Sequence, residues 1–151
     1  MSDIFYEGYT ISTDKSKLDL DYIHHYLSGA SYWARNIPPS VVQTSIDHAF
    51  CVGAFKEDQQ VGFGRLITDY ATFGYVADIF VDELHRGRGL SKQIVKLMLA
   101  QPFVRGLRRL MLGTRDAHGL YAQYGFSAIK NPAAFMEIHR PDIYVQFEDH
   151  G

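Results

Sequence analysis

The chain has 151 residues but only one cysteine, Cys51, and almost no excess of charge of either sign. A single cysteine excludes a disulfide framework within the chain and is typical of a protein from a reducing compartment. Its apolar neighbours favour a buried structural thiol over a nucleophile. Fifteen Lys+Arg against seventeen Asp+Glu give a net charge of -2, which excludes the uniformly basic surface of a sequence-indifferent nucleic-acid binder.

Signals for export and for membrane insertion are also missing. Residues 1–10 are acidic and aromatic, without the basic and apolar regions of a signal peptide, and nowhere do 18 apolar residues run together. We therefore expect no export signal, no membrane span and a cytoplasmic location. No linker, repeat or low-complexity tract interrupts the chain, and a chain of this size can bury about 70% of its unfolded surface. This predicts one domain, residues 1–151.

Motifs of several enzyme classes are absent too. The seven histidines are scattered without an H-E-x-x-H pattern, and no G-x-S-x-G occurs, so metalloproteases and α/β-hydrolases have no support and we expect no metal site. The glycine-rich segment around Gly87 contains neither a Walker A loop nor the third glycine of the dinucleotide fingerprint. A nucleotide-binding module of another kind remains a weak third hypothesis.

What the chain does have is an alternation of element types along its length. Aromatic and branched runs bounded by polar turns predict strands, and apolar residues at helical spacing predict helices. A crossover helix between two strands makes them parallel, whereas hairpins are antiparallel, so the sheet should be mixed. The expected strands are residues 6–12, 50–55, 60–68, 73–81, 109–114, 126–130 and 143–147, and the expected helices are residues 18–27, 38–49, 90–98 and 116–124.

A glycine turn joins the strand at 73–81 to the helix at 90–98. Gly87 and Gly89 leave main-chain amides open to an anion, and the helix that follows presents unpaired N–H groups and a positive dipole end. Arg86, Arg88 and Lys92 add positive charge, as a pyrophosphate requires. A turn that merely closes a strand-helix-strand unit has the same composition, so the turn alone leaves both interpretations open.

Two motifs in register resemble those of the GCN5-related N-acetyltransferases, the GNAT family. The segment Arg86-Gly87-Arg88-Gly89-Leu90-Ser91 is similar to the family's acyl-CoA motif [QR]-x-x-G-x-[GA], with serine as the last small residue. The segment from Ala117 to Phe126 looks like the family's A-x-x-L-Y-x-x-x-G-F. Thr114 stands where the family often has asparagine. The resemblance implies an α/β (α+β) fold with a twisted, mostly antiparallel sheet of six or seven strands, about four helices and one parallel strand pair at the cofactor site.

The resemblance also implies the activity: transfer of an acetyl group from acetyl-CoA to an amine of a small molecule or peptide, by direct attack in a ternary complex. No metal is implied, and a homodimer is possible because small family members often associate. A non-catalytic acyl-CoA sensor that uses the same pocket is the alternative function. The residues implied to bind the cofactor are Ile79, Phe80, Val81, Arg86, Gly87, Arg88, Gly89, Leu90, Ser91, Lys92 and Tyr121.

Two residues are the catalytic candidates. Asp78 is the lone acid in an apolar strand, where an unpaired charge is costly, and the family often keeps a general base on this strand. An ion pair with Arg65 would explain the same residue without catalysis. Tyr121 occupies the position of the family's general acid, which protonates the departing thiolate. Packing beneath the helix is the alternative for Tyr121.

The acceptor site is expected near aromatic residues. An aromatic pair lies between the first two expected helices, a second aromatic group lies at the turn before the strand at 73–81, and Arg65 could orient an acidic group of the substrate. Aromatic and acidic side chains suit a small cationic amine, although core packing explains aromatic residues equally well. The candidate acceptor residues are Tyr32, Trp33, Arg65, Tyr70 and Phe73.

Overall fold

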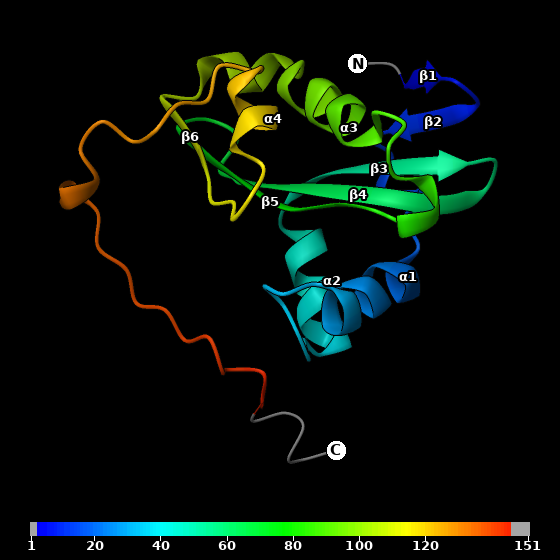
Figure 1. Ribbon diagram of the computed structural model, residues 1–151, viewed down its shortest axis with the longest axis horizontal. Helices are drawn as coiled ribbons and strands as arrows, with labels where there is room; N and C mark the ends of the chain where they lie inside the picture. Colours follow the sequence, from blue (N-terminus) through cyan, green and yellow to red (C-terminus); the bar gives the residue numbers. More distant parts are fainter. Residues whose placement is uncertain (1–2, 146–151) are drawn as a thin grey trace.

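A six-stranded sheet organises the residues that the computed structural model describes, 3–145 (Figure 1). Spatial order follows chain order, and each neighbouring pair is antiparallel except the last, β5–β6, which a helical crossover makes parallel. The expected mixed sheet with one parallel pair is thereby confirmed. The strands are β1 (Ile4–Tyr6), β2 (Tyr9–Ser12), β3 (Phe50–Lys56), β4 (Gln59–Thr68), β5 (Phe73–Val81) and β6 (Arg109–Leu112).

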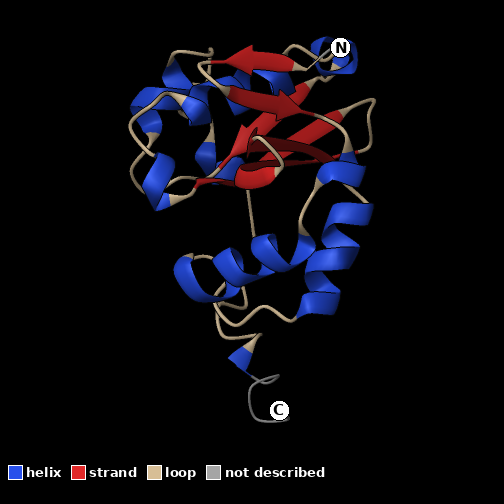
Figure 2. Cartoon of the chain, turned by 90° about the vertical axis from the view of Figure 1, so that its right-hand side faces the viewer, coloured by secondary structure: helices blue, strands red, loops and turns tan. Residues whose placement is uncertain are grey.

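Helices cover both faces of this sheet, α3 and α4 on one face and α1 and α2 on the other (Figures 1 and 2). None of the helices in residues 3–145 is long and apolar enough to cross a membrane. The α-helices are α1 (Leu20–His25), α2 (Pro39–Asp47), α3 (Leu90–Leu99) and α4 (His118–Ala122), with a π-helical turn at Tyr26–Ala30 and short 3-10 turns at Lys15–Lys17, Glu83–His85, Pro102–Gly106 and Pro132–Ala134.

Two apolar cores result, one on each face of the sheet. Helix α3 buries Leu90, Ile94, Leu97 and Met98 against one face, and α1 and α2 bury a second set that includes Ile23 against the other. Successive strand residues point to opposite faces, so neighbours along one strand belong to different cores. Gly64 of β4 has no side chain, and a β-carbon at this position would lie 2.7 Å from Ile94 Cγ2 of α3. Glycine at this position therefore lets α3 approach the sheet closely.

The N-terminal elements differ in detail from the sequence prediction. Residues 6–12 form a hairpin rather than one strand, because Glu7 (φ 48°) and Gly8 (φ 87°) make a tight turn between β1 and β2. The first helix begins at Leu20, where the Asp19 carboxylate accepts a hydrogen bond from the Tyr22 amide at 3.0 Å. Asp14 caps the preceding 3-10 turn, where its carboxylate accepts a hydrogen bond from the Ser16 amide at 2.9 Å.

The prediction of two closing strands is wrong for the part of these segments that the structure describes. Residues 126–130 and 143–145 form no strand, and residues 146–147 of the second expected strand lie outside the described residues. A strand needs a neighbour for its main-chain hydrogen bonds, and these segments have none among residues 3–145. They belong instead to a C-terminal arm, residues 127–145, which leaves the body after α4 and passes outside it, coloured orange to red in Figure 1.

Candidate active site

The site begins where β5 and β6 separate. Their parallel pairing runs from Phe73↔Arg109 to Val76↔Leu112 and ends there. Beyond this point β5 continues through residues 77–81 with antiparallel pairing to β4 alone. Within the described part of the chain, the side of β5 that faced β6 is therefore open for its last five residues, and its main-chain groups have no strand partner there.

A cavity of about 560 Å³ lies in this opening. Its walls come from residues 75–79 of β5, from the loop that follows β6, from α4 and from the loop after the first helical segment. It is lined by Tyr32, Trp33, Tyr75, Val76, Ala77, Asp78, Ile79, Leu112, Gly113, Thr114, Arg115, Asp116, Ala117 and Tyr121. The cavity thus brings both catalytic candidates together with the expected aromatic pair.

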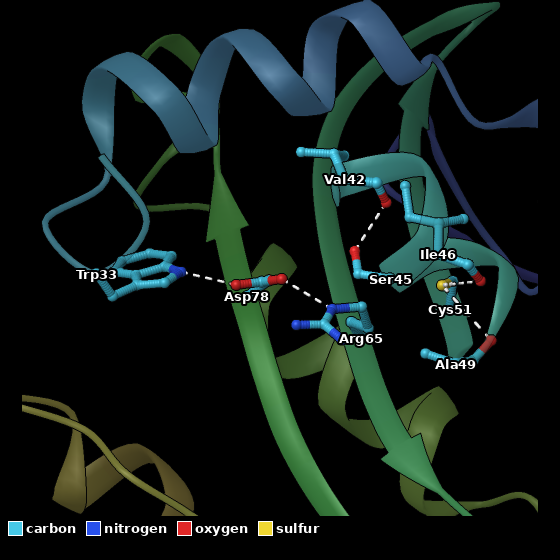
Figure 3. Close-up of polar contacts among 8 residues, drawn as sticks. All are labelled: Trp33, Val42, Ser45, Ile46, Ala49, Cys51, Arg65 and Asp78. Atoms are coloured by element: carbon cyan, nitrogen blue, oxygen red, sulfur yellow. Dashed lines mark hydrogen bonds and ion pairs between the residues drawn. The ribbon is translucent and has the colours of Figure 1, made fainter. Parts of the chain in front are cut away.

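Asp78 lies at an irregularity of the sheet. Its φ is 55°, in the left-handed region, and the β4–β5 register shifts beside it, between Phe63 and Arg65. Such a bulge re-aims the side chain out of the regular alternation. The carboxylate bridges two elements (Figure 3): Oδ1 accepts a hydrogen bond from Trp33 Nε1 at 2.7 Å, and Oδ2 accepts one from Arg65 Nε at 2.8 Å.

The alternative of an Asp78–Arg65 ion pair is therefore present in the structure. The Asp78 side chain is 9% exposed and that of Arg65 16%, so the pair is largely shielded from water and its charges compensate each other. Each carboxylate oxygen nevertheless has two lone pairs, and each accepts one hydrogen bond from these partners. Asp78 can still accept a hydrogen bond from a group in the cavity.

Tyr121 reaches the same cavity from α4. Its side chain is buried, and its ring packs edge-on against Phe126 at 5.9 Å between centroids. Burial, with a smaller contribution from Tyr32, raises the pKa of the Tyr121 phenol above its ordinary value. No residue in the range 3–145 forms a hydrogen bond with the Tyr121 hydroxyl. Within the same range every fully buried side-chain polar atom has a hydrogen-bond partner, so the Tyr121 hydroxyl oxygen is not fully buried. The hydroxyl therefore faces the open space of the cavity as a protonated donor.

A second cavity, of about 310 Å³, lies over the glycine turn. Gly87 (φ 79°) and Gly89 (φ 81°) both adopt left-handed backbone, which glycine reaches without strain. The first hydrogen bond of α3 is donated by the Gln93 amide to the Gly89 carbonyl, so the preceding amides point out of the helix end. The cavity is lined by Val81, His85, Arg86, Gly87, Gly89, Leu90, Ser91, Lys92 and Leu120.

The three basic side chains of the turn are not equivalent. Arg86 lines the cavity but donates to the Val81 carbonyl (3.0 Å) and the Tyr26 hydroxyl (3.0 Å), so its guanidinium is already held by the protein. Arg88 is exposed and does not line either cavity, and its carbonyl accepts from Tyr6. Lys92 lines the cavity and is exposed, which leaves it as the accessible cation at the helix end.

Of the β5 residues expected to contact the cofactor, two keep that position. Ile79 lines the large cavity and Val81 the small one. The Phe80 side chain points the other way, into the core beneath the sheet, where it stacks on Tyr26 with 3.8 Å between ring centroids. Only its main chain can face a ligand in the opening.

The expected acceptor residues are divided by the fold. Tyr32 and Trp33 line the large cavity, and Arg65 lies behind Asp78. Tyr70, in the turn before β5, and Phe73, the first residue of β5, lie outside this cavity. There Tyr70 packs on Phe103 with 4.8 Å between centroids, and Asp69 organises the turn by accepting from Thr72 and the main chain, which holds the pKa of its carboxyl well below the usual range.

Comparison with known proteins fits this geometry. Residues 20–126 match the family model described as the acetyltransferase (GNAT) family. A protein of Gibberella zeae named as a putative acetyltransferase is 28% identical, in a match that covers 76% of this chain and 76% of its own. The crystal structure of a GNAT-family protein from Xanthomonas campestris pv. campestris is 47% identical, covers 93% of this chain and 99% of its own, and has a TM-score of 0.89.

The chain belongs to the GNAT family of acetyltransferases. The fold is shared more widely than the sequence: glucosamine-6-phosphate N-acetyltransferase from Arabidopsis thaliana is 14% identical, with a TM-score of 0.61 over 89% of this chain and 98% of its own. At that identity the likeness concerns the fold alone.

This GNAT domain has a cavity wall that the sequence reasoning missed. Arg115 follows β6 and places its guanidinium carbon 3.8 Å from the centroid of the Tyr32 ring, a cation–π contact. Thr114 accepts a hydrogen bond from the Ala117 amide at 3.1 Å and so shapes the start of the α4 segment. A signal was available, because residues just beyond the carboxyl end of a parallel strand often line ligand sites.

The lone cysteine of this GNAT domain is structural. Cys51 is buried beneath α2, and its Sγ lies 3.9 Å from the Ile46 carbonyl and 3.8 Å from that of Ala49 (Figure 3). Burial is the main cause that raises the pKa of its thiol to about 11. A thiol that stays protonated is a poor nucleophile. Among residues 3–145 no group of three or more His, Cys, Asp or Glu side chains is arranged to hold a metal ion.

Proposed function

We propose that the protein is an acetyl-CoA-dependent N-acetyltransferase that acts on an amine of a small molecule or peptide by direct attack in a ternary complex. One observation carries the proposal: the two cavities follow one another along the open half of β5. Ile79 and Tyr121 line the large cavity, whereas Val81 and Leu120 line the small one. A long ligand with an anionic end and a reactive end fits this arrangement.

The small cavity would hold the pyrophosphate of the cofactor. The amides at the start of α3 have no intrahelical acceptors, the helix dipole is positive there, and Lys92 supplies an accessible charge. The glycines leave room for main chain to approach an anion closely. Arg86 would act through its contacts with Val81 and Tyr26, which hold the glycine turn against the π-helical turn that follows α1.

The large cavity would hold the reacting groups. Acetyl-CoA supplies the activated thioester, whose carbon–sulfur bond breaks as the new carbon–nitrogen bond forms. Main-chain N–H groups of the open half of β5, near Ile79, are available to a carbonyl oxygen on which charge develops. Tyr121, protonated and facing the cavity, donates its proton to the departing sulfur.

Asp78 would act on the acceptor amine. Trp33 and Arg65 fix its carboxylate in one orientation, and a lone pair directed to the cavity can accept a hydrogen bond from an ammonium group and take up its proton. Tyr32 and Trp33 give this part of the cavity aromatic faces, which bind cations. The acceptor class that fits is a cationic amine.

An acyl-CoA sensor without catalysis is the second candidate. The observation that favours it is the ion pair itself, because Asp78 has a structural task that does not require proton transfer. In this case the small cavity would still bind coenzyme A, but no thiol would be released in the presence of any amine. Binding and turnover must therefore be measured separately.

Thiol release from acetyl-CoA tests the proposal, with polyamines, amino acids, aminoglycosides and peptide N-termini as acceptors. Turnover with one of these classes supports the enzyme, and coenzyme A binding without turnover on any of them supports the sensor. Thermal unfolding is followed in parallel with coenzyme A, ATP and NAD. Protection by ATP or NAD but not by coenzyme A would contradict both candidates.

Two lysines of α3 provide a matched pair of variants for the cofactor site. Lys92→Glu reverses the charge at the helix end and should weaken coenzyme A binding about 10-fold or more. Lys96→Glu makes the same charge change one turn further along the exposed side of α3, away from the cavity, and should leave binding within about 2-fold. Equal losses in both variants would show that only net charge matters.

A further inference from the structure

Arg115 is a charged side chain of the large cavity that the proposed mechanism does not use. Its guanidinium carbon lies 3.8 Å from the centroid of the Tyr32 ring, and a guanidinium stacked on a ring keeps its N–H donors in its own plane, clear of the ring. Within residues 3–145 these donors have no hydrogen-bond or ion-pair partner. The stack thus orients the guanidinium of Arg115 and leaves its donors available to a ligand.

Arg65, expected from the sequence to orient an acidic group of the substrate, is not available for that task. It donates a hydrogen bond to Asp78 Oδ2 at 2.8 Å, and its side chain is only 16% exposed. Arg65 does not line the large cavity, and of the described residues that do, Arg115 is the only one with a positive charge. An anionic group of a ligand in this cavity therefore has Arg115 as its accessible partner.

The cavity wall also carries negative charge. Asp78 and Asp116 line it together with Arg115, and in the described part of the chain neither carboxylate forms an ion pair with the Arg115 guanidinium. Opposite charges that line one cavity without pairing suit a ligand that carries both signs. A ligand with several positive groups would instead bring one of them close to Arg115, at an electrostatic cost. The charges of the wall are therefore complementary to a zwitterion.

The aromatic pair of the cavity determines where the two charges of such a ligand would lie. The Tyr32 and Trp33 rings meet edge-on with 5.0 Å between their centroids. Arg115 lies over the first ring, and the indole of the second donates a hydrogen bond to Asp78 Oδ1 at 2.7 Å (Figure 3). Arg115 and Asp78 thus stand at the two ends of the pair, and an acceptor with its amine at Asp78 would extend along the rings towards Arg115.

We propose that the acceptor is an amine that also carries an anionic oxygen group, a carboxylate or a phosphate, and that Arg115 binds this group while Asp78 receives the ammonium. The inference rests on the proposed function and narrows its acceptor class from cationic amines to amines with an acidic group. The planar fork of a guanidinium matches two oxygens of a carboxylate or a phosphate. Arg115 binds the acceptor and takes no part in the bond changes.

The single tryptophan of the chain makes acceptor binding measurable without turnover. Trp33 lines the cavity and bonds Asp78, so a ligand at this carboxylate should change the fluorescence of Trp33, and calorimetry checks any ligand without a fluorescence change. With coenzyme A present, the protein is titrated with glycine, β-alanine, γ-aminobutyrate and phosphoethanolamine, and in parallel with the amide of each amino acid and with ethanolamine, which lack the anionic group. At least one anionic amine should bind about 10-fold or more tightly than its counterpart. A panel in which no anionic amine binds more tightly than its counterpart would overturn the proposal.

Two substitutions of Arg115 separate recognition of an anion from packing of the cavity wall. Arg115→Glu should weaken binding of the best anionic amine about 10-fold or more without weakening binding of its counterpart. Arg115→Lys retains the charge but not the planar fork and should lose about 3-fold. Both variants should keep the unfolding midpoint and the coenzyme A affinity of the wild type, because the side chain is exposed. Equal losses for the two members of a ligand pair in Arg115→Glu would mean that the residue only shapes the wall, and would overturn the proposal.

Arg109→Glu is the matched control. Arg109 of β6 also lies over an aromatic ring, with its guanidinium carbon 4.8 Å from the Phe135 centroid, but it does not line the large cavity. The substitution makes the same change of net charge and should leave the affinity for the anionic amine within about 2-fold. An equal loss in Arg109→Glu and Arg115→Glu would assign the effect to net charge and overturn the proposal.

Thiol release from acetyl-CoA with the same ligands and with polyamines distinguishes this inference from the proposed function. If anionic amines bind through Arg115 but no thiol is released, the proposed acetyl transfer is wrong and the anion site is supported. If amides, ethanolamine or polyamines are acetylated and anionic amines are not, the proposed function is supported and the anion site is overturned. Acetylation of an anionic amine whose KM rises in Arg115→Glu, with the KM for acetyl-CoA unchanged, would support both.

Discussion

The two halves of β5 have similar apolar sequences but opposite surroundings. Residues 73–76 pair with β4 on one side and β6 on the other, whereas residues 77–81 pair with β4 alone. The first half is a conventional inner strand, of which Tyr75 and Val76 also reach the large cavity, and residues of the second half line both cavities. The proposed site lies where a neighbouring strand is missing, since only there can the main chain of a sheet interior bind a ligand.

The second half of β5 also contains the departures from regular geometry. The positive φ of Asp78, its ion pair with Arg65 and the β4–β5 register shift all occur after residue 76. A strained residue persists only when its surroundings hold it, and such residues concentrate at functional sites. Substitutions in the two halves should therefore have different effects. Those in the first half should mainly lower the free energy of unfolding, and those in the second half should mainly lower kcat.

The largest effect is expected from Val76→Asp in the paired half. Val76 is 4% exposed, and an unpaired carboxylate there should lower the free energy of unfolding by about 4 kcal/mol or more. Tyr75→Asp is the matched control, because the neighbouring side chain is 36% exposed and has access to water. Urea denaturation measures both, and equal losses would mean that strand pairing rather than burial is at stake.

Asp78→Asn should act on the chemistry of the open half, with a loss of kcat of about 100-fold. It should also lower the free energy of unfolding by about 1–3 kcal/mol, because Arg65 loses its charged partner in a shielded place. The double variant Arg65→Met, Asp78→Asn removes both charges. Recovery of stability without recovery of kcat would separate the two roles, whereas joint recovery would reduce Asp78 to a structural residue.

Tyr121→Phe should lower kcat by about 10–100-fold, since a thiolate is a fair leaving group and only part of the barrier depends on the acid. Burial raises the pKa of the phenol above 10, so it stays protonated throughout an assay between pH 6 and pH 9. The ratio of wild-type to variant kcat should therefore be constant over that range. Tyr124→Phe is the control, because that hydroxyl donates to the Lys92 carbonyl outside the large cavity.

The smallest effect is expected from Arg115→Gln, which removes the charge over Tyr32 but leaves the strand pairing intact. We expect KM for the acceptor to change about 3–10-fold, with little change in KM for acetyl-CoA, because a desolvated cation–π contact is worth about 1–2 kcal/mol. Steady-state kinetics with each substrate varied in turn decides this. A change confined to the KM for acetyl-CoA would indicate that Arg115 contacts the cofactor rather than the acceptor.

Much of the fold could be predicted because periodicity and turn residues are local signals. The strands from β3 to β5, the glycine turn and helix α3 were expected within a few residues of their positions, and Gly89 indeed begins α3 with a positive φ. The hairpin within residues 6–12 was missed because Glu7 is an unusual residue for left-handed backbone. The prediction of a strand at 126–130 was wrong because a strand forms only where another segment of the chain pairs with it.

The site was predictable as far as motifs and single unusual residues reach. Asp78 and Tyr121 do meet in one cavity, as their family positions imply. Tyr70 and Phe73 were predicted to contribute because the turn that contains them could face the acceptor pocket, yet the cavity wall on β5 begins only at Tyr75. Arg115 was missed because its place depends on where β6 ends and on the contact with Tyr32.

The strictly sequential order of the strands has a kinetic consequence. The β1–β2, β3–β4 and β4–β5 pairings are hairpins that close short loops and form early. The β2–β3 pairing must bring together strands separated by α1 and α2, and the β5–β6 pairing must wait for helix α3 and the turns around it to cross the sheet. The joint that contains the large cavity therefore depends on one of the two long-range pairings of the sheet, and the cavity forms only after the hairpins are in place.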